Sequence, residues 1–384
     1  MNENVMSSVS TSTSVSVATG ELNTVDEPVA AFCEAVARIG LPTLIPNASV
    51  DFSFLTHDSR LLPLTISRGE TGGSYVVQPH SAYIGYAIDE LSYLNLGWGR
   101  LGLACLVRAV GWPLLAAGIG RSVLIDNYGF ATNLHGDWHG QGLAKMREQL
   151  YQQYPRHFFG IRSVDPWSSP ELCRALQADG WLFLPARQVW TIDDPEKEWR
   201  PRSHVKRDQK LVRDSRVEIE DLEKLTDSDA QRITDLYQSL YRQKYSCLNP
   251  DYTARWIQLL VDTRLVTFRV ARDRDGQIQA MAGHLERDGL LTVPLIGYDR
   301  SQPQASGLYR IASWLSGDHA ARKNLRFHAS AGAGAFKRHR GARGQIEFLA
   351  CYVNHLPRTQ QFLWRRFSCF LYRHLVPLLV NNGW

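Results

Sequence analysis

The chain has 384 residues, 44% of them hydrophobic and 21% charged, which indicates a soluble globular protein long enough for two domains and excludes a wholly disordered chain. Its 43 Lys and Arg residues and 38 Asp and Glu residues give a net charge of +5, but these charges are unevenly distributed. From Ala320 to the C-terminus eleven basic residues accompany one acid, Glu347, and Arg200–Arg216 contains seven bases and two acids. This asymmetry predicts an anionic partner: a cofactor, tRNA or a membrane surface.

The six cysteines are scattered, without a CxxC pair or the spacing of metal ligands. Such usage is typical of thiols buried in a protein of the reducing cytoplasm, so we predict a cytoplasmic protein. Residues 1–25 are rich in Ser, Thr and Val and lack the basic start and apolar core of a signal peptide. A disordered tail is predicted there.

Residues 26–198 alternate between helical and strand patterns, which predicts a mixed α/β domain. Helices are expected after Asp26, from Pro79, over Gln141–Tyr154 and from the capping box at Ser168 to Gly180. The expected strands are Leu61–Ser67, Ser74–Gln78, Ser122–Phe130, His157–Val164 and Trp181–Ile192.

Two segments of this domain invite a functional interpretation. Leu101–Gly118 is strongly apolar, but Arg108 at its centre and Pro113 argue against a membrane span and favour a buried pair of helices. His135 and His139 flank an aspartate in a glycine-containing loop. Because no further ligand follows at helical spacing, we predict no metal site.

The second domain is predicted to span residues 199–356, with its boundary within the charged connection Asp193–Arg202. Its first helix places Arg202, Lys206, Lys210 and Arg213 on one face, either as an anion-binding surface or as a solvated face. Two amphipathic helices follow, then three strands joined by Asp-Gly turns and a helix from Leu308. The strands are Leu265–Arg272, Gln277–Glu286 and Leu290–Tyr298.

Residues 324–355 read as a strand, a glycine-rich basic loop and a second strand. Flexible backbone beside fixed cations suits an anionic group, most often a phosphate. The alternative is a solvated turn rich in arginine. The predicted phosphate ligands are Gly332, Gly334, Lys337, Arg338 and Arg340.

The chain ends, over residues 357–384, in a pattern typical of a basic amphipathic helix. Phe362, Trp364, Phe367, Phe370 and Leu371 supply its apolar residues. Contact with a membrane surface through this helix is one possible role.

The order of elements from about Arg200 to His355 resembles the GNAT acyltransferase fold, and more narrowly its FemAB-type branch, in which two GNAT-like domains lie in tandem. A basic helix around Ser203, Arg207 and Lys210 and the stretch GAGAFKR, similar to a late G-x-x-x-FK element, carry the resemblance. The resemblance implies two tandem α/β domains, each with a mixed, mostly antiparallel sheet flanked by helices. It also implies acyl transfer to a small or peptide-like amine from acyl-CoA or aminoacyl-tRNA, with no tightly bound cofactor.

Gln304 and Gly307 match the family's pyrophosphate loop, whereas Tyr309 stands where that loop has a small residue. We therefore expect weak binding of acetyl-CoA. Within the implied fold His284 and Glu286 share one strand face and Tyr298 ends the next strand, which makes them candidates for base and acid. His284 could equally be a core residue and Glu286 an edge charge. The competing function is a non-catalytic anion- or RNA-binding protein on a degenerate GNAT scaffold.

Overall fold

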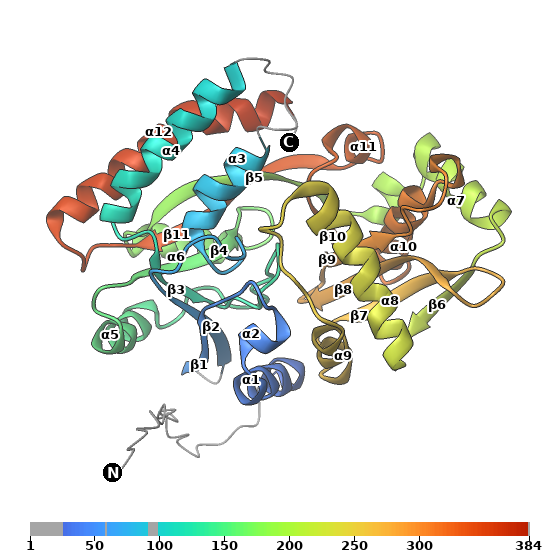
Figure 1. Ribbon diagram of the computed structural model, residues 1–384, viewed down its shortest axis with the longest axis horizontal. Coiled ribbons are helices and arrows are strands. Elements are labelled where there is room, and N and C mark those ends of the chain that lie inside the picture. The colour runs from blue at the N-terminus through green and yellow to red at the C-terminus, as the bar shows by residue number, and fades with distance from the viewer. Residues whose placement is uncertain (1–25, 58–59, 91–98, 383–384) are drawn as a thin grey trace, which may run out of the picture.

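The computed structural model describes residues 26–57, 60–90 and 99–382, and Figure 1 shows their arrangement. The predicted tail at residues 1–25 lies outside the described residues. The first half of the chain contains α1 (Glu27–Ile39), α2 (Leu41–Leu44), β1 (Asp51–His57), β2 (Arg60–Arg68), η1 (Ser81–Tyr86), α3 (Ala87–Glu90), α4 (Gly99–Ala116), β3 (Arg121–Ile125), α5 (Leu143–Gln153), β4 (Phe158–Val164), α6 (Pro170–Ala178) and β5 (Leu182–Ile192).

The second half begins near the predicted boundary at residue 199, where η3 ends and a short connection leads into α7. Its elements are η3 (Pro195–Trp199), α7 (Ser203–Asp214), β6 (Glu218–Leu222), α8 (Asp227–Gln238), η4 (Ser239–Tyr245), α9 (Ala254–Asp262), β7 (Thr267–Arg272), β8 (Ile278–Arg287), β9 (Leu290–Tyr298), η5 (Gln304–Ser306), α10 (Leu308–Arg322), β10 (Arg326–Ala331), α11 (Gly334–Arg338), β11 (Arg343–Tyr352) and α12 (Arg358–Asn382).

Within the described residues, eleven strands form one sheet in the order β1-β2-β3-β4-β11-β5-β10-β9-β8-β7-β6. Two neighbouring pairs are parallel, β3–β4 and β9–β10, and the crossovers that join them contain α5 and α10 respectively. The other neighbouring pairs are antiparallel. Each half thus repeats the sequence of antiparallel strands, helix and parallel strand. The structure confirms the predicted class, a mixed α/β protein with a mostly antiparallel sheet flanked by helices.

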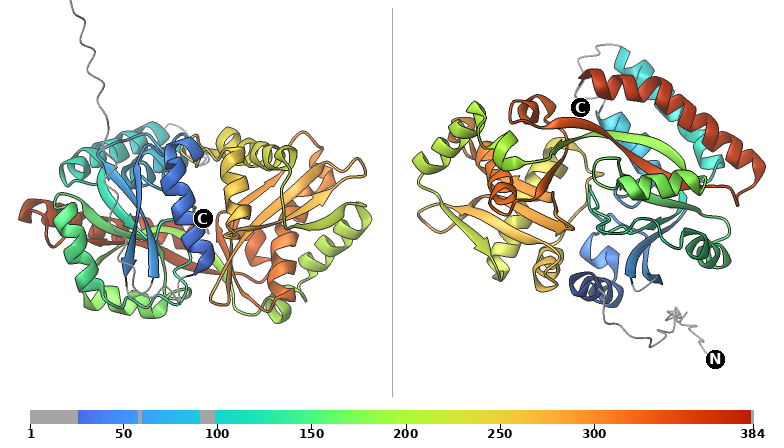
Figure 2. Two further views of the ribbon diagram at one scale, coloured as in Figure 1. Left: turned by 90° about the horizontal axis from the view of Figure 1, so that it is seen from below. Right: turned by 180° about the vertical axis from the view of Figure 1, so that it is seen from behind.

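The sheet does not divide at the predicted domain boundary. Strand β11 belongs to the second half of the chain but lies between β4 and β5 of the first half. The other neighbour of β5 is β10, so both strands that pair with β5 come from the second half. Both views in Figure 2 show the halves side by side, with β11 in red reaching into the first half.

Three local predictions need correction. Ser74–Gln78 is a turn instead of a strand, because the Gln78 side chain accepts a hydrogen bond from Gly73 N and the Gln78 amide bonds back to Ser74 O. The glycine-rich segment predicted as a loop contains the short helix α11.

The third correction concerns Leu101–Gly118, which forms a single helix, α4, with Pro113 inside it and one side exposed. The neighbouring α12 stabilises its end, because Gln360 Nε2 and Trp364 Nε1 donate to the carbonyls of Ala116 and Ala117. Among the described residues no helix combines the length and apolarity needed to cross a membrane.

Candidate functional site

A cavity of about 600 Å³ lies where β9 passes through η5 into α10. Its walls come from four parts of the second half: α7, the end of η4, the β9–α10 connection, and the segment of α11 and the residues after it. The lining residues are His204, Arg207, Lys244, Tyr298, Asp299, Gln302, Pro303, Gln304, Ser306, Gly307, Leu308, Tyr309, Arg310, Phe336, His339 and Arg340.

Gly307 shapes the entrance to α10. It has φ 66° and ψ 24°, a left-handed conformation that favours glycine. A Cβ atom at this position would also lie 2.6 Å from Cδ2 of Leu211 on α7, so the Leu211 side chain would have to shift to admit one. The N-terminus of a 15-residue helix therefore opens at the cavity wall, where its unbonded amides and dipole favour an anion.

A buried carboxylate on α7 holds two of the cavity's arginines. Asp208 accepts a hydrogen bond from Arg310 Nε at 2.6 Å and one from Arg340 Nε at 2.7 Å, through its two different oxygens. The Arg340 guanidinium also donates to the Phe336 carbonyl and lies over the Phe336 ring, 3.3 Å from its centroid. We call Asp208, Arg310 and Arg340 the carboxylate fork. It links α7, α10 and the turn after α11.

The remaining walls are aromatic and cationic. The Tyr309 ring lies 5.8 Å from that of Tyr298 and 4.9 Å from that of Phe336. The His204 ring, also in the lining, stacks on the His339 ring with their centroids 4.9 Å apart. Desolvation and then the charge of Arg340 lower the pKa of His204, which therefore stays neutral at physiological pH. The cavity combines stacking surfaces for a ring system with charges for phosphate groups.

The structure brings four of the predicted site residues together in this cavity: Tyr298, Gln304, Gly307 and Arg340. Two other predicted phosphate ligands point elsewhere. The Arg338 guanidinium lies over the Trp190 ring, 5.4 Å from its centroid, and not in the cavity. Gly332 is exposed and is also outside the cavity lining.

Gly334 is buried at the first position of α11 and is likewise outside the lining.

Lys337 serves a different purpose from the predicted one of phosphate binding. Its Nζ donates to the carbonyls of Ala329 at 2.6 Å and Ala331 at 2.8 Å, and lies 3.3 Å from that of Ser330. Burial, followed by the charge of Arg187, lowers the pKa of Lys337 to about 7, while the three carbonyl acceptors favour its protonated form. The side chain of Lys337 in α11 thus bonds to the last three carbonyls of β10 and fixes the helix to the end of that strand.

The one acid of β11 pairs with a charge of the first half. Arg187 donates to both oxygens of Glu347, at 2.8 and 3.1 Å, and its Nη2 also donates to Ala131 O and Thr132 Oγ1. Although burial opposes ionisation, Arg187 lowers the pKa of Glu347. Thr132 and Ser330 share a hydrogen bond of 2.9 Å beside this pair, so the contact between the halves is polar at its centre.

His284 and Glu286 share a face of β8 as predicted, but neither lines the cavity. His284 is buried, its Nε2 lies 3.3 Å from Ser316 Oγ, and burial followed by the nearby His319 lowers its pKa well below the usual range. Glu286 accepts hydrogen bonds from His319 at 2.6 Å and Lys323 at 2.8 Å, which lower its pKa even though burial raises it. These residues join β8 to α10, and their predicted acid and base roles have no support from this position.

The basic helix α7 presents other residues to the cavity than those predicted. The lining includes His204 and Arg207, whereas Lys206 and Lys210 are exposed outside it. Arg202, also outside the lining, donates to the Glu198 carbonyl.

The functional face of α7 was predicted from the positions of its basic residues. The face that packs against the protein is instead set by the buried residues Val205, Asp208 and Val212. The sequence signal that was missed is an acid, Asp208, in the middle of a run of basic residues.

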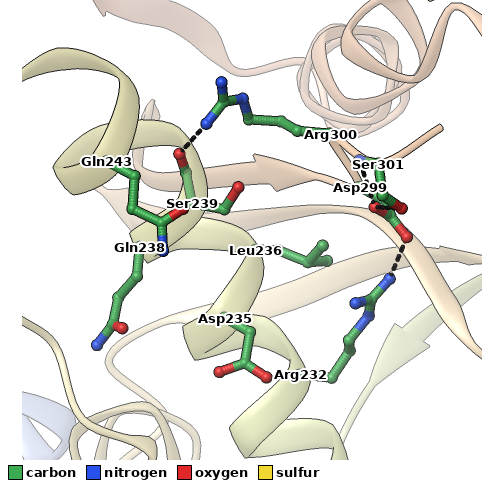
Figure 3. Close-up of a pocket in the computed structure, with 9 residues that line it drawn as sticks. All are labelled: Arg232, Asp235, Leu236, Gln238, Ser239, Gln243, Asp299, Arg300 and Ser301. Carbon is green, nitrogen blue, oxygen red and sulfur yellow. Dashed lines mark hydrogen bonds and ion pairs between the residues drawn. The ribbon is translucent and has the colours of Figure 1, made fainter. Parts of the chain in front are cut away.

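A second cavity, of about 310 Å³, adjoins the first and shares Asp299 with it (Figure 3). Asp299 accepts from Arg232 Nη2 at 2.8 Å and from Ser301, and Arg300 Nη1 donates to Ser239 O. Outside both cavities, the two ring nitrogens of His135 form hydrogen bonds with the Asp126 carboxylate and the Arg162 carbonyl. No group of three or more possible metal ligands occurs in the part of the chain that the structure describes.

No protein-family model matches the chain, and no curated protein matches its sequence. Among solved structures, the C-terminal domain of a protein assigned as a lysylphosphatidylglycerol synthetase from Agrobacterium fabrum is 12% identical, with a TM-score of 0.46 over 90% of this chain and 96% of that one. L-PGS from Bacillus licheniformis is 11% identical, with a TM-score of 0.48 over 89% and 96%. FemX is 8% identical, with a TM-score of 0.41 over 54% and 75%. GNAT acetyltransferases are also among the matches. These likenesses assign no substrate or activity to this chain.

Proposed function

We propose that the protein is an acyltransferase that moves an acyl or aminoacyl group from a phosphate-bearing donor to an amine. The observation that carries the proposal is the cavity at the N-terminus of α10. It combines the arginines of the carboxylate fork, a further exposed arginine, Arg207, and the aromatic residues Tyr298, Tyr309 and Phe336. Donor phosphates held by the arginines and a base stacked on an aromatic ring would account for this combination.

In the proposed reaction the nitrogen of a neutral amine attacks the carbonyl carbon of the donor. An amide bond forms, the ester or thioester bond breaks, and the proton lost by the nitrogen passes to the leaving group. The positive cavity would stabilise the negative charge that develops on the carbonyl oxygen and on the leaving group.

The donor is either acyl-CoA or aminoacyl-tRNA, and Tyr309 bears on the choice. Its ring belongs to the cavity wall at the second position of α10, where a pyrophosphate would need open backbone amides. We therefore expect weak binding of acetyl-CoA by the native protein and stronger binding by Tyr309→Gly, measured by titration calorimetry. Binding of acetyl-CoA by the native protein at low micromolar concentration would instead favour acyl-CoA as the donor.

The test of the proposal compares two arginines of the same helix. Arg207 lines the cavity, whereas Arg213 is exposed and outside its lining. Arg207→Ala should weaken binding of the donor, either CoA or an aminoacylated RNA minihelix, by roughly five- to a hundredfold, as expected for one charge-assisted contact. Arg213→Ala should leave it unchanged. Equal affinities of both variants and the native protein would overturn the proposed donor site.

A non-catalytic anion- or RNA-binding protein is the second candidate. It is favoured by the position of His284 and Glu286, which lie outside the cavity and are bound to residues of α10. Mass spectrometry of a model amine incubated with the protein and each donor separates the two functions. Amide product in excess of a protein-free control supports the transferase, and tight binding without product supports the binding protein.

A further inference from the structure

Helices α4 and α12 lie side by side on the outer surface of the first half, in cyan and red in Figure 1. They run antiparallel, because hydrogen bonds from Gln360 and Trp364, near the start of α12, reach carbonyls at the end of α4. Trp364, Phe367 and Leu371 pack inward with Leu114 of α4 and residues of the sheet. The opposite side of the pair is open to solvent, and we call it the α4/α12 face.

The α4/α12 face concentrates the exposed apolar side chains of the protein. Among the described residues, ten large hydrophobic side chains are notably exposed, and eight of them belong to these two helices. The most exposed is Trp112, at 78%, and apolar side chains gathered in one patch, unlike single ones, mark an interaction surface. The other seven are Leu101, Leu115, Phe362, Phe370, Tyr372, Leu378 and Val380. Of these, Tyr372 lies beside the face, because its ring stacks on that of Phe348 in β11.

The same face carries positive charge without any negative charge. Five exposed arginines lie on the two helices, and neither α4 nor α12 contains an Asp or Glu residue. In the part of the chain that the structure describes, none of the five makes an ion pair with an acid. They are Arg108, Arg358, Arg365, Arg366 and Arg373.

We propose that the α4/α12 face docks the protein on a membrane surface that contains anionic phospholipids. Exposed aromatic and aliphatic side chains can enter the boundary between headgroups and acyl chains, while the arginines bind the lipid phosphates. The two helices, of 18 and 25 residues, are roughly 27 and 37 Å long and form a platform broad enough for many headgroups.

Charge complementarity selects this occupant over a second copy of the chain. A two-fold dimer through the α4/α12 face would bring its arginines against the same arginines of the other copy, with no acid on either helix to neutralise them. An anionic bilayer neutralises all of them at once. The proposal concerns a surface away from the cavity and does not depend on the transferase activity.

Vesicle flotation with the full-length protein tests the proposal. We expect binding to vesicles of phosphatidylcholine mixed with phosphatidylglycerol, little binding to phosphatidylcholine alone, and weakening by salt. The triple variant Arg365→Glu, Arg366→Glu and Arg373→Glu should lose at least a hundredfold in affinity, since each removed arginine alone is worth about fivefold near an anionic surface. Trp112→Ser should weaken binding several-fold, and it provides the test if the triple variant does not fold.

The matched control carries the same change in net charge at three exposed positions outside both helices: Lys145→Glu, Lys224→Glu and Arg255→Glu. Retained vesicle binding by this control supports the α4/α12 face. The proposal is overturned if the control loses as much affinity as the α12 variant, or if the native protein does not prefer anionic vesicles. It is also overturned if the native protein is a dimer by analytical ultracentrifugation that Trp112→Ser dissociates.

Discussion

Replacement of Asp208 by Asn tests whether the carboxylate fork supports the cavity. The Asp208 side chain is 2% exposed and that of its partner Arg340 is 8% exposed, so this pair is removed from water. Breaking a buried pair leaves an uncompensated charge and costs about 3–5 kcal/mol. Arg310 is 38% exposed and contributes less than about 1 kcal/mol. Because asparagine keeps one acceptor oxygen, we expect a net loss of about 2–4 kcal/mol.

Urea unfolding followed by circular dichroism measures this loss as a shift of the midpoint at unchanged slope. Asp214→Asn is the matched control: the same substitution on the same helix, at a side chain that is 53% exposed and paired with its neighbour Arg213. It should change the free energy of unfolding by less than about 0.5 kcal/mol. If Asp208→Asn were as stable as Asp214→Asn, the fork would not be holding α7, α10 and the turn after α11 together.

Three further changes have definite expected outcomes. Gly307→Ala should destabilise the protein by about 0.5–1.5 kcal/mol more than Gly276→Ala. Both glycines have positive φ, but a Cβ at 307 lies 2.6 Å from Leu211, which must leave its rotamer, and one at 276 meets nothing within 4 Å. Equal losses in urea titrations would contradict this. His284→Gln should flatten the fall of stability below about pH 6.5 by up to about 1.4 kcal/mol per pH unit. Burial keeps the folded pKa of His284 far below its unfolded value, so acid protonates the unfolded chain first, and an unchanged slope would refute that role. Lys337→Met should cost about 2–4 kcal/mol by leaving three carbonyls without their donor, and an unaltered melting temperature would show that water replaces it.

The local parts of the fold could be predicted from the sequence. The Asp-Gly turns at 275–276 and 288–289 fix two hairpins within a few residues, and β7, β8 and β9 form there as expected. The position of β11 could not be predicted, because its partners lie far earlier in the chain: Glu347 pairs with Arg187 of β5, and Phe348 pairs with Val164 of β4. Period-two alternation defines a strand but does not say which strands will be its neighbours.

The candidate site was predictable where the backbone itself carries the signal. Gln304 and Gly307 were predicted because they match the pyrophosphate loop of the GNAT family, and the structure places both at the cavity. His204 and Arg207 were missed, since the side of α7 that faces inward is decided by packing against α10. Asp208 carried a usable signal, because a single acid flanked by bases at both neighbouring turns is a candidate for a buried partner.

The insertion of β11 between β4 and β5 has a consequence for synthesis of the protein. When the first half leaves the ribosome, β5 has no strand to pair with, and β4 keeps one edge open until residues 343–352 follow. Open edges are templates for pairing with other chains. The nascent first half therefore exposes strand edges to other chains for longer than the second half, whose β10 and β11 find β5 already made. A stop codon shortly before residue 343 would release a chain with that edge permanently unfilled.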